Sequence, residues 1–304
     1  MKAIILILLS IMTLNNCSDS VLRSRKNVNR RNLPPGKLFE GPQLKAAQSI
    51  FDENNVELTN VIKAHPEIIN QLSDKEEDNG YTLLHYAALL ENMKAMESLL
   101  QNGADPNIIM PQGLPVKHAV ALNDYNMLDL LLKYHATLNP AVGVNPLSDA
   151  MVLGDENVER KMINYLLEHG ADINHVSYNG GNIMEDATRD DLDLASYFLE
   201  KGGQPVIAGT NLSPMANYIQ YKEKQKNERS LPDSPYYQKL LALKKQLTEK
   251  YNVQFPYQKD TIEEAKLRIK LYENLSPKDK ISVNFKKNYG ENRYQEDLAI
   301  VKGK

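Results

Sequence analysis

Histidines and closely spaced aspartates are the residues of this 304-residue chain that could do chemistry. Two of the six histidines, His169 and His175, are separated by five residues that include a glycine and a turn signal. No cysteine or third ligand lies near them, whereas zinc sites need three or four converging ligands. The spacing therefore does not predict a metal site.

Asp190, Asp191 and Asp193 lie close together in the segment TRDDLDL, and clustered carboxylates of this kind could bind calcium. A calcium-binding helix–loop–helix needs a loop of about 12 residues with a central glycine and a closing glutamate, and neither is present. Aspartates at the start of a helix also complement its dipole. The chain has no glycine-rich phosphate loop and no nucleophile elbow around a serine. We expect no catalytic residue, no metal and no cofactor.

The first 17 residues, MKAIILILLSIMTLNNC, have a basic start and an apolar run of about 12 residues that ends just before Cys17, the single cysteine. This run is too short for a membrane span, which takes about 20 residues, and fits a secretory leader. The pattern resembles a bacterial lipoprotein signal, which implies cleavage before Cys17 and lipidation of it. Asn16 departs from the small residue that this family favours there. A plain secretory signal and an uncleaved anchor remain alternatives.

Charge is unevenly distributed along the chain, although the formal net charge is only −3. Residues 36–207 contain 11 Lys/Arg and 26 Asp/Glu, whereas both flanking segments are basic. Such an asymmetry bears on partners rather than on fold. We expect a protein partner with a basic surface and no nucleic acid, because the tail lysines are expected to solvate helical faces. Residues 17–36, which are basic and poor in apolar side chains, should form a flexible tether.

The stretch GYTLLHYAALLENMKAMESLLQNGADPN, residues 80–107, recurs in two halves. Its ending LLQNGADPN returns as LLKYHATLN, LLEHGADIN and FLEKGGQPV at steps of 32, 35 and 32 residues. Thr82 suits a helix N-cap and Gly103 suits the end of a second helix. One such unit cannot bury its own apolar face, so neighbouring units must stack.

A period near 33 with these two halves resembles the ankyrin repeat. The resemblance implies an all-α fold, an ankyrin-repeat solenoid with about four recognisable repeats and helical caps at both ends. In ankyrin repeats the histidine at the place of His85 bonds to neighbouring backbone, so a structural role is implied for it. His118 is expected at the surface or in a groove, and His65 at a helix end.

The expected organisation has five parts. They are a signal peptide at 1–16, the tether at 17–36, the ankyrin-repeat domain at 43–207, a C-terminal helical cap at 208–275, and a polar, partly disordered tail at 276–304. Within the cap, helices are predicted from about Pro235 to Tyr251 and from Thr261 to Leu275. A short extended piece is predicted at Ile281–Phe285.

Ankyrin stacks usually bind proteins through turn tips and the exposed side of each first helix. Carried onto this chain, the expected partner-binding residues are Asn79, Tyr81, Tyr86, Leu89, Met110, Gln112, Leu114, His118, Val144, Asp149, Tyr178, Asn179 and Asp186.

The resemblances together imply a binding protein, lipid-anchored through Cys17 and facing the periplasm of a bacterial envelope. The leading hypothesis is an immunity protein that inhibits a secreted antibacterial toxin, with a lipase as one possible target. A periplasmic scaffold or stress-protective protein is the alternative within this class. Two others stay open: an enzyme with its site in the C-terminal region, and a secreted effector directed at a host. The alternative location is a secreted or soluble periplasmic one.

Overall fold

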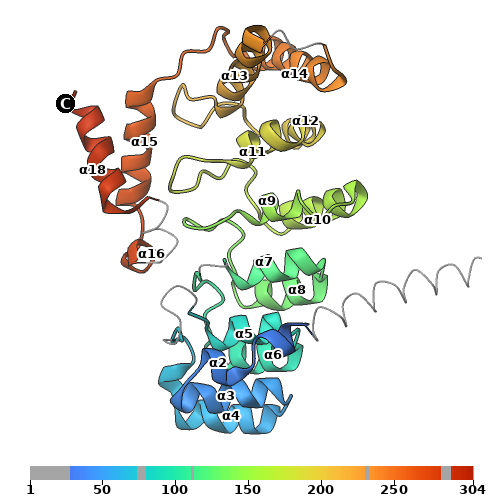
Figure 1. The fold of residues 1–304 in the computed structure, drawn as a ribbon, viewed down its shortest axis with the longest axis vertical. Coiled ribbons are helices and arrows are strands. Elements are labelled where there is room, and N and C mark those ends of the chain that lie inside the picture. Colours follow the sequence, from blue (N-terminus) through green and yellow to red (C-terminus); the bar gives the residue numbers. More distant parts are fainter. Residues whose placement is uncertain (1–27, 74–79, 111–112, 230–232, 282–288, 304) are drawn as a thin grey trace, which may run out of the picture. The chain divides into compact units, whose positions relative to one another are not determined.

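The computed structural model describes residues 28–73, 80–110, 113–229, 233–281 and 289–303, which divide into two compact units (Figure 1). The first unit ends at Thr137 and the second begins at Leu138. Cys17 and the signal peptide lie outside the described residues, as do Asn79, Gln112 and most of the segment 281–285. No helix in the described part of the chain is long and apolar enough to cross a membrane.

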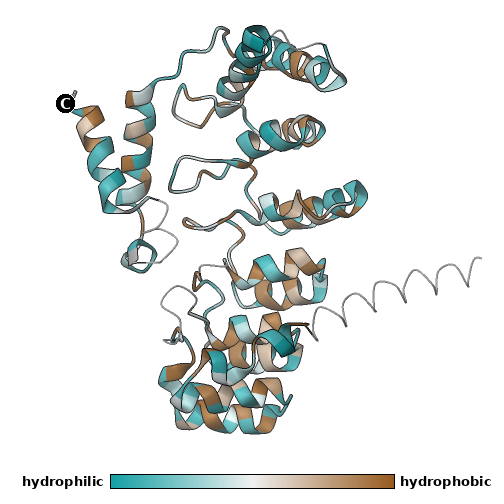
Figure 2. Cartoon of the chain, in the orientation of Figure 1, coloured by the Kyte–Doolittle hydropathy of each residue, from teal (hydrophilic) through white to brown (hydrophobic). Residues whose placement is uncertain are grey.

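The first unit is a stack of antiparallel helix pairs. Its helices are α2 (Pro35–Leu38), α3 (Gly41–Phe51), α4 (Asn55–Ala64), the 3-10 helix η1 (Pro66–Ile68), α5 (Leu83–Leu89), α6 (Met93–Gln101), α7 (Pro115–Leu122) and α8 (Tyr125–Lys133). Helices α3 and α4 pair, as do α5 with α6 and α7 with α8, and α3, α5 and α7 pack in succession. The apolar faces between the pairs form the core, and hydrophilic residues lie on the same helices (Figure 2).

The second unit continues the same pattern and adds a helical hairpin. Its helices are α9 (Pro146–Ala150), α10 (Glu156–Glu168), α11 (Ile183–Asp190), α12 (Leu192–Glu200), α13 (Pro214–Arg229), α14 (Pro235–Tyr251), α15 (Thr261–Glu273), α16 (Pro277–Ile281) and α18 (Gly290–Val301). Helix α11 packs on α9 and α13, and α12 packs on α14. The described residues are thus an all-α, ankyrin-type repeat solenoid, as the sequence predicts.

The predicted caps and turns explain where the repeat helices begin and end. The side-chain oxygen of Thr82 accepts a hydrogen bond from the His85 amide at 3.2 Å and starts α5. Gly103 takes φ +94° after α6, and His135, which replaces glycine in the next repeat, takes φ +63°. A residue in the left-handed conformation is common after a helix. This conformation is retained in the second repeat although histidine replaces the glycine.

The asparagines that end the first three repeat motifs bond to the following repeat, a role that the repeat pattern alone does not show. Asn107 donates its side-chain amide to the His135 carbonyl at 2.9 Å and accepts from the Thr137 amide at 2.7 Å. Asn70, Asn139 and Asn174 do the same one repeat apart. Each asparagine thus bonds the carbonyl of the left-handed residue that follows a repeat helix.

Residues 28–36 do not behave as the flexible tether that was expected. Residues 28–32 are helical, and Pro35 in α2 is buried. Arg30 lies over the Phe51 ring, with its guanidinium carbon 4.5 Å from the ring centroid. The segment has few apolar side chains, but polar contacts and the buried Leu38 and Phe39 that follow it hold it on the first unit.

The expected disorder of the polar tail does not hold for residues 290–301, which form α18 and pack on α15. Arg268 of α15 donates two hydrogen bonds to Asp297 of α18, at 2.7 and 2.9 Å. The Tyr289 hydroxyl donates a third at 2.6 Å. Asp297 is fully buried, so polar residues form the centre of this hairpin, where hydrophobic patterning gives no signal.

Candidate functional site

Four of the six partner-binding positions predicted in the first unit that the structure describes are buried. Tyr81 is 8% exposed, Tyr86 and Met110 are 0% exposed and Leu114 is 6% exposed, so these four cannot offer their side chains to a partner in this structure. Leu89 is partly exposed. The ankyrin pattern correctly placed them on helices and turn loops but did not show what covers them.

The chain's own N-terminal segment covers the first repeat. The Tyr86 hydroxyl donates to the Leu33 carbonyl at 2.9 Å, and its ring meets Phe39 edge-on with centroids 5.2 Å apart. The Asn29 side chain donates to the Leu89 carbonyl at 2.8 Å. Burial raises the pKa of the Tyr86 hydroxyl above its ordinary range. Tyr86 is therefore an intramolecular anchor, which corrects its prediction as a partner contact.

His85 is structural, as the ankyrin resemblance implies. Its Nδ1 lies 2.7 Å from the Thr82 hydroxyl and its Nε2 lies 3.2 Å from the Gly113 carbonyl, so it joins its own cap to the next turn loop. The ring is 0% exposed, and burial, together with the nearby His118, lowers the pKa of His85 to about 3. His118 is partly exposed, and burial lowers its pKa to about 4.

Positions predicted in the second unit remain more accessible. Val144 is 50% exposed, Asn179 is exposed, and Asp149 and Asp186 are partly exposed. Val144, Asn179 and Asp186 line one cavity of about 180 Å³ between the turn loops. Tyr178 is the exception at 5% exposed, because its ring meets Tyr289 edge-on at 6.1 Å.

The histidine and aspartate clusters considered for metal binding have protein partners. The Nε2 atom of His175 lies 2.9 Å from the Pro140 carbonyl, and the Nδ1 atom of His169 lies 2.8 Å from the Tyr165 carbonyl. Asp191 caps α12, Asp190 pairs with Arg189, and Asp193 pairs with Lys239. Among the described residues, no group of three or more His, Cys, Asp or Glu side chains is placed to hold a metal ion.

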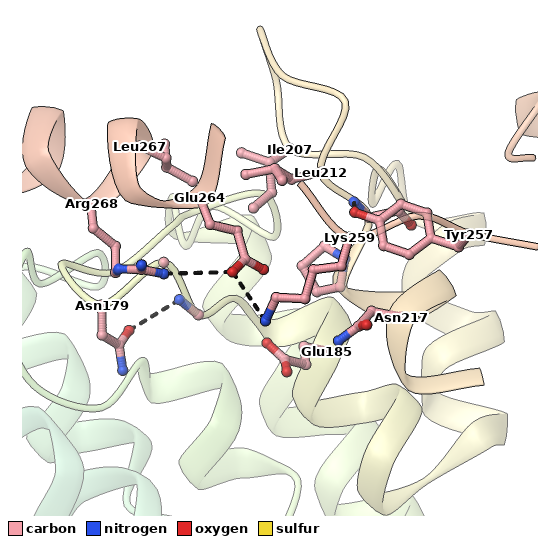
Figure 3. A pocket seen from close by; sticks show the side chains of 14 residues that line it. Asn179, Glu185, Ile207, Leu212, Asn217, Tyr257, Lys259, Glu264, Leu267 and Arg268 are labelled. Carbon is pink, nitrogen blue, oxygen red and sulfur yellow. Dashed lines mark hydrogen bonds and ion pairs between the residues drawn. The ribbon is translucent and has the colours of Figure 1, made fainter. Parts of the chain in front are cut away.

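A second cavity, of about 250 Å³, was not predicted (Figure 3). Its lining comes from four segments: the turn loop at Asn179–Gly181, helix α11, the loop before α13 with the start of that helix, and the linker with helix α15. The Tyr257 hydroxyl holds the linker by accepting from the Ser213 amide at 3.0 Å. No local sequence signal joins these segments, because 85 positions separate Asn179 from Glu264 in the chain.

Glu264 organises one wall of this second cavity. Its carboxylate lies 3.0 Å from the Lys259 ammonium and 3.8 Å from the Arg268 guanidinium. Glu185 on α11 lines the same cavity (Figure 3). Burial raises the pKa of the Glu185 carboxyl, and Asp186 raises it further.

Paired antiparallel helices that stack through turn loops define a helical repeat protein of the solenoid class. The family model that matches this chain is the ankyrin repeat, over residues 79–110. The match covers α5, α6 and the turn loop to Met110, and it supports the ankyrin-repeat family and a role in protein interaction.

Proposed function

We propose that this chain binds a basic protein partner through the repeats of its second unit. The observation that carries the proposal is the charge of residues 138–207, which hold 4 Lys/Arg against 12 Asp/Glu. Of those twelve acidic residues, only Glu159 is buried. The corresponding face of the first repeat is covered by residues 29–39, so the second unit offers more of the first-helix positions that a partner could contact.

Ankyrin-type solenoids present turn loops and first helices to other proteins, and the accessible predicted positions of the second unit lie on those elements. Exposed carboxylates attract a basic partner at long range and raise the association rate. The exposed Val144 supplies an apolar contact beside Asn179 and Asp186. This arrangement favours fast, salt-sensitive binding over binding through large aromatic anchors.

Within this function, we propose that the partner is a secreted antibacterial toxin and that the chain is its immunity protein, held at the periplasmic side of the envelope by a lipid on Cys17. The leader pattern and the basic segment after it support the location. A partner that arrives in the periplasm would meet the acidic repeats there.

The test is direct binding between the purified chain and the product of the neighbouring gene, measured by biolayer interferometry across ionic strength. Asp186→Asn should slow association, whereas Glu249→Gln, which removes the same charge at an exposed position of α14 outside residues 138–207, is the matched control. Screening should slow wild-type association between about 0.05 and 0.5 M salt. Absence of binding would refute the proposal. An association rate that changes neither with salt nor in Asp186→Asn would also refute it. Metabolic lipid labelling of Cys17→Ser against wild type tests the anchor separately.

A further inference from the structure

The second cavity combines an apolar wall with a carboxylate. Ile207 and Leu212 are 7% and 3% exposed and line it together with Leu267. Glu185 and Asn217 also line it. Apolar sides with a polar group suit a side chain that has an aliphatic stem and a charged end. The cavity of about 250 Å³ has room for several waters of about 30 Å³ each, and hence for one long side chain.

Among the described charged groups that line this cavity, only the Glu185 carboxylate forms no ion pair within 4 Å, although Arg189 and Lys259 also act on it at longer range. Lys259 pairs with Glu264, and Arg268 pairs with Asp297 and Glu264. Within the described part of the chain, the Glu185 carboxylate has no hydrogen-bond donor, and the Asn217 side-chain amide also makes no hydrogen bond.

The arrangement selects a cation over an anion. Lys259 and Arg268 already have acidic partners within 4 Å, so an anion would have to displace Glu264 or Asp297. A guanidinium or ammonium group would instead meet Glu185, whose partly desolvated charge gains from a counter-ion. Asn217 has an amide oxygen that can accept from the same cation.

We propose that this cavity receives an arginine or lysine side chain of the protein partner, with Glu185 as its counter-ion and Ile207, Leu212 and Leu267 around its stem. The inference rests on the proposed protein-binding function and names a contact within it. It extends the partner-binding surface from the turn loops to helix α15, which belongs to the expected C-terminal cap.

The experiment titrates the isotopically labelled full chain with three tripeptides and follows the amide signals of Gly180, Gly181 and Asn217 by NMR. The probes are acetyl-Gly-Arg-Gly-amide, its lysine counterpart, and its citrulline counterpart. Citrulline has the shape of arginine without the charge. The arginine and lysine peptides should bind with Kd values on the order of 1–10 mM, as expected for one ion pair with a short apolar stem. The citrulline peptide should bind at least tenfold more weakly.

Two variants make the result specific to the cavity. Glu185→Gln keeps the side-chain size and should weaken arginine-peptide binding about tenfold, whereas the matched control Glu200→Gln should change it less than twofold. Asn217→Asp adds a second carboxylate and should tighten binding several-fold. A gain of affinity cannot result from a damaged fold.

Equal binding of arginine and citrulline peptides, unchanged binding by Glu185→Gln, or no shift up to about 50 mM peptide would overturn the inference. The proposed function has its own readout in the salt-sensitive association with the partner protein. If partner binding persists while the peptides fail, the cavity inference is wrong and the protein-binding function stands. If the peptides bind and no partner does, the cavity is a site for small cations and both the partner assignment and this inference fail.

Discussion

Acidification should weaken the first unit through His85, because this residue is neutral and fully buried in the native state. Its pKa is about 3 when folded, against 6.5 for an unperturbed histidine. The unfolded state therefore binds a proton that the folded state excludes, and stability is lost as the pH falls below about 6.5. At pH 5 the difference is about 1.5 pH units at 1.36 kcal/mol each, or about 2 kcal/mol. The loss continues as the pH falls toward 3.

Hydrogen exchange of the amides in α5 measures this effect where it arises. After correction for intrinsic exchange, a loss of about 2 kcal/mol lowers protection about 30-fold between pH 7 and pH 5. His118, whose pKa is lowered to about 4, adds to the wild-type loss. The test therefore compares the loss of α5 protection between pH 7 and pH 5 in wild type with the same loss in His85→Gln.

His85→Gln should remove about 2 kcal/mol of the pH-dependent loss, whatever it does to stability at pH 7. His169→Gln, at an exposed position of the second unit, controls for removal of an imidazole elsewhere. If wild type and His85→Gln lose protection in parallel between pH 7 and pH 5, His85 is not excluded from protonation in the folded state and the reasoning is refuted.

Three further predictions follow from the two ends of the chain and the cavity. Asp297→Ala should destabilise the α15–α18 hairpin by about 3 kcal/mol, because it leaves Arg268 and Tyr289 without their buried acceptor. Hydrogen exchange of residues 290–301 measures this loss. Glu296→Ala, which removes an exposed ion pair, is the control. Tyr86→Phe should weaken the docking of residues 28–34 by about 1 kcal/mol, and Phe39→Ala should weaken it by about 3–5 kcal/mol. The rate of proteolysis within that segment measures both effects. Equal rates in both variants and wild type would contradict its docking on the first repeat. Arginine-peptide binding should strengthen as the pH rises through the raised pKa of Glu185, because the carboxyl then becomes charged. The other charged groups that act on this carboxyl are Asp186, Arg189, Lys259 and Glu264. In Glu185→Gln this pH dependence should be absent.

Local patterns in the sequence were sufficient for the repeat helices. Thr82 and Gly103 bound a helix pair by rules that act within a few residues, and α14 spans Pro235–Tyr251 as predicted. The asparagines at the repeat ends were visible in the pattern, but their role was not. Their partners lie about 30 residues away, so only the stacked structure shows that they join repeats.

The candidate contacts were harder to predict because exposure depends on distant segments. Tyr86 meets Leu33 across 53 positions, and Tyr178 meets Tyr289 across 111. A repeat motif assigns both tyrosines to places that are open in an isolated solenoid. It carries no information on whether the chain's own ends return to cover them.

The burial of these tyrosines by other segments of the chain affects how tightly a partner can bind. Large aromatic side chains dominate many interfaces, yet Tyr81, Tyr86 and Tyr178 are each at most 8% exposed. With these tyrosines buried, the accessible surface of residues 138–207 is acidic and polar, and Val144 is the largest exposed apolar residue among the contacts predicted there. Such a surface speeds association more than it slows dissociation. Tight binding that persists at high salt would therefore require a terminal segment to move and release a tyrosine. Removing a released ring should then weaken the complex, so an unchanged affinity of Tyr178→Ala at high salt would show that this covered tyrosine takes no part.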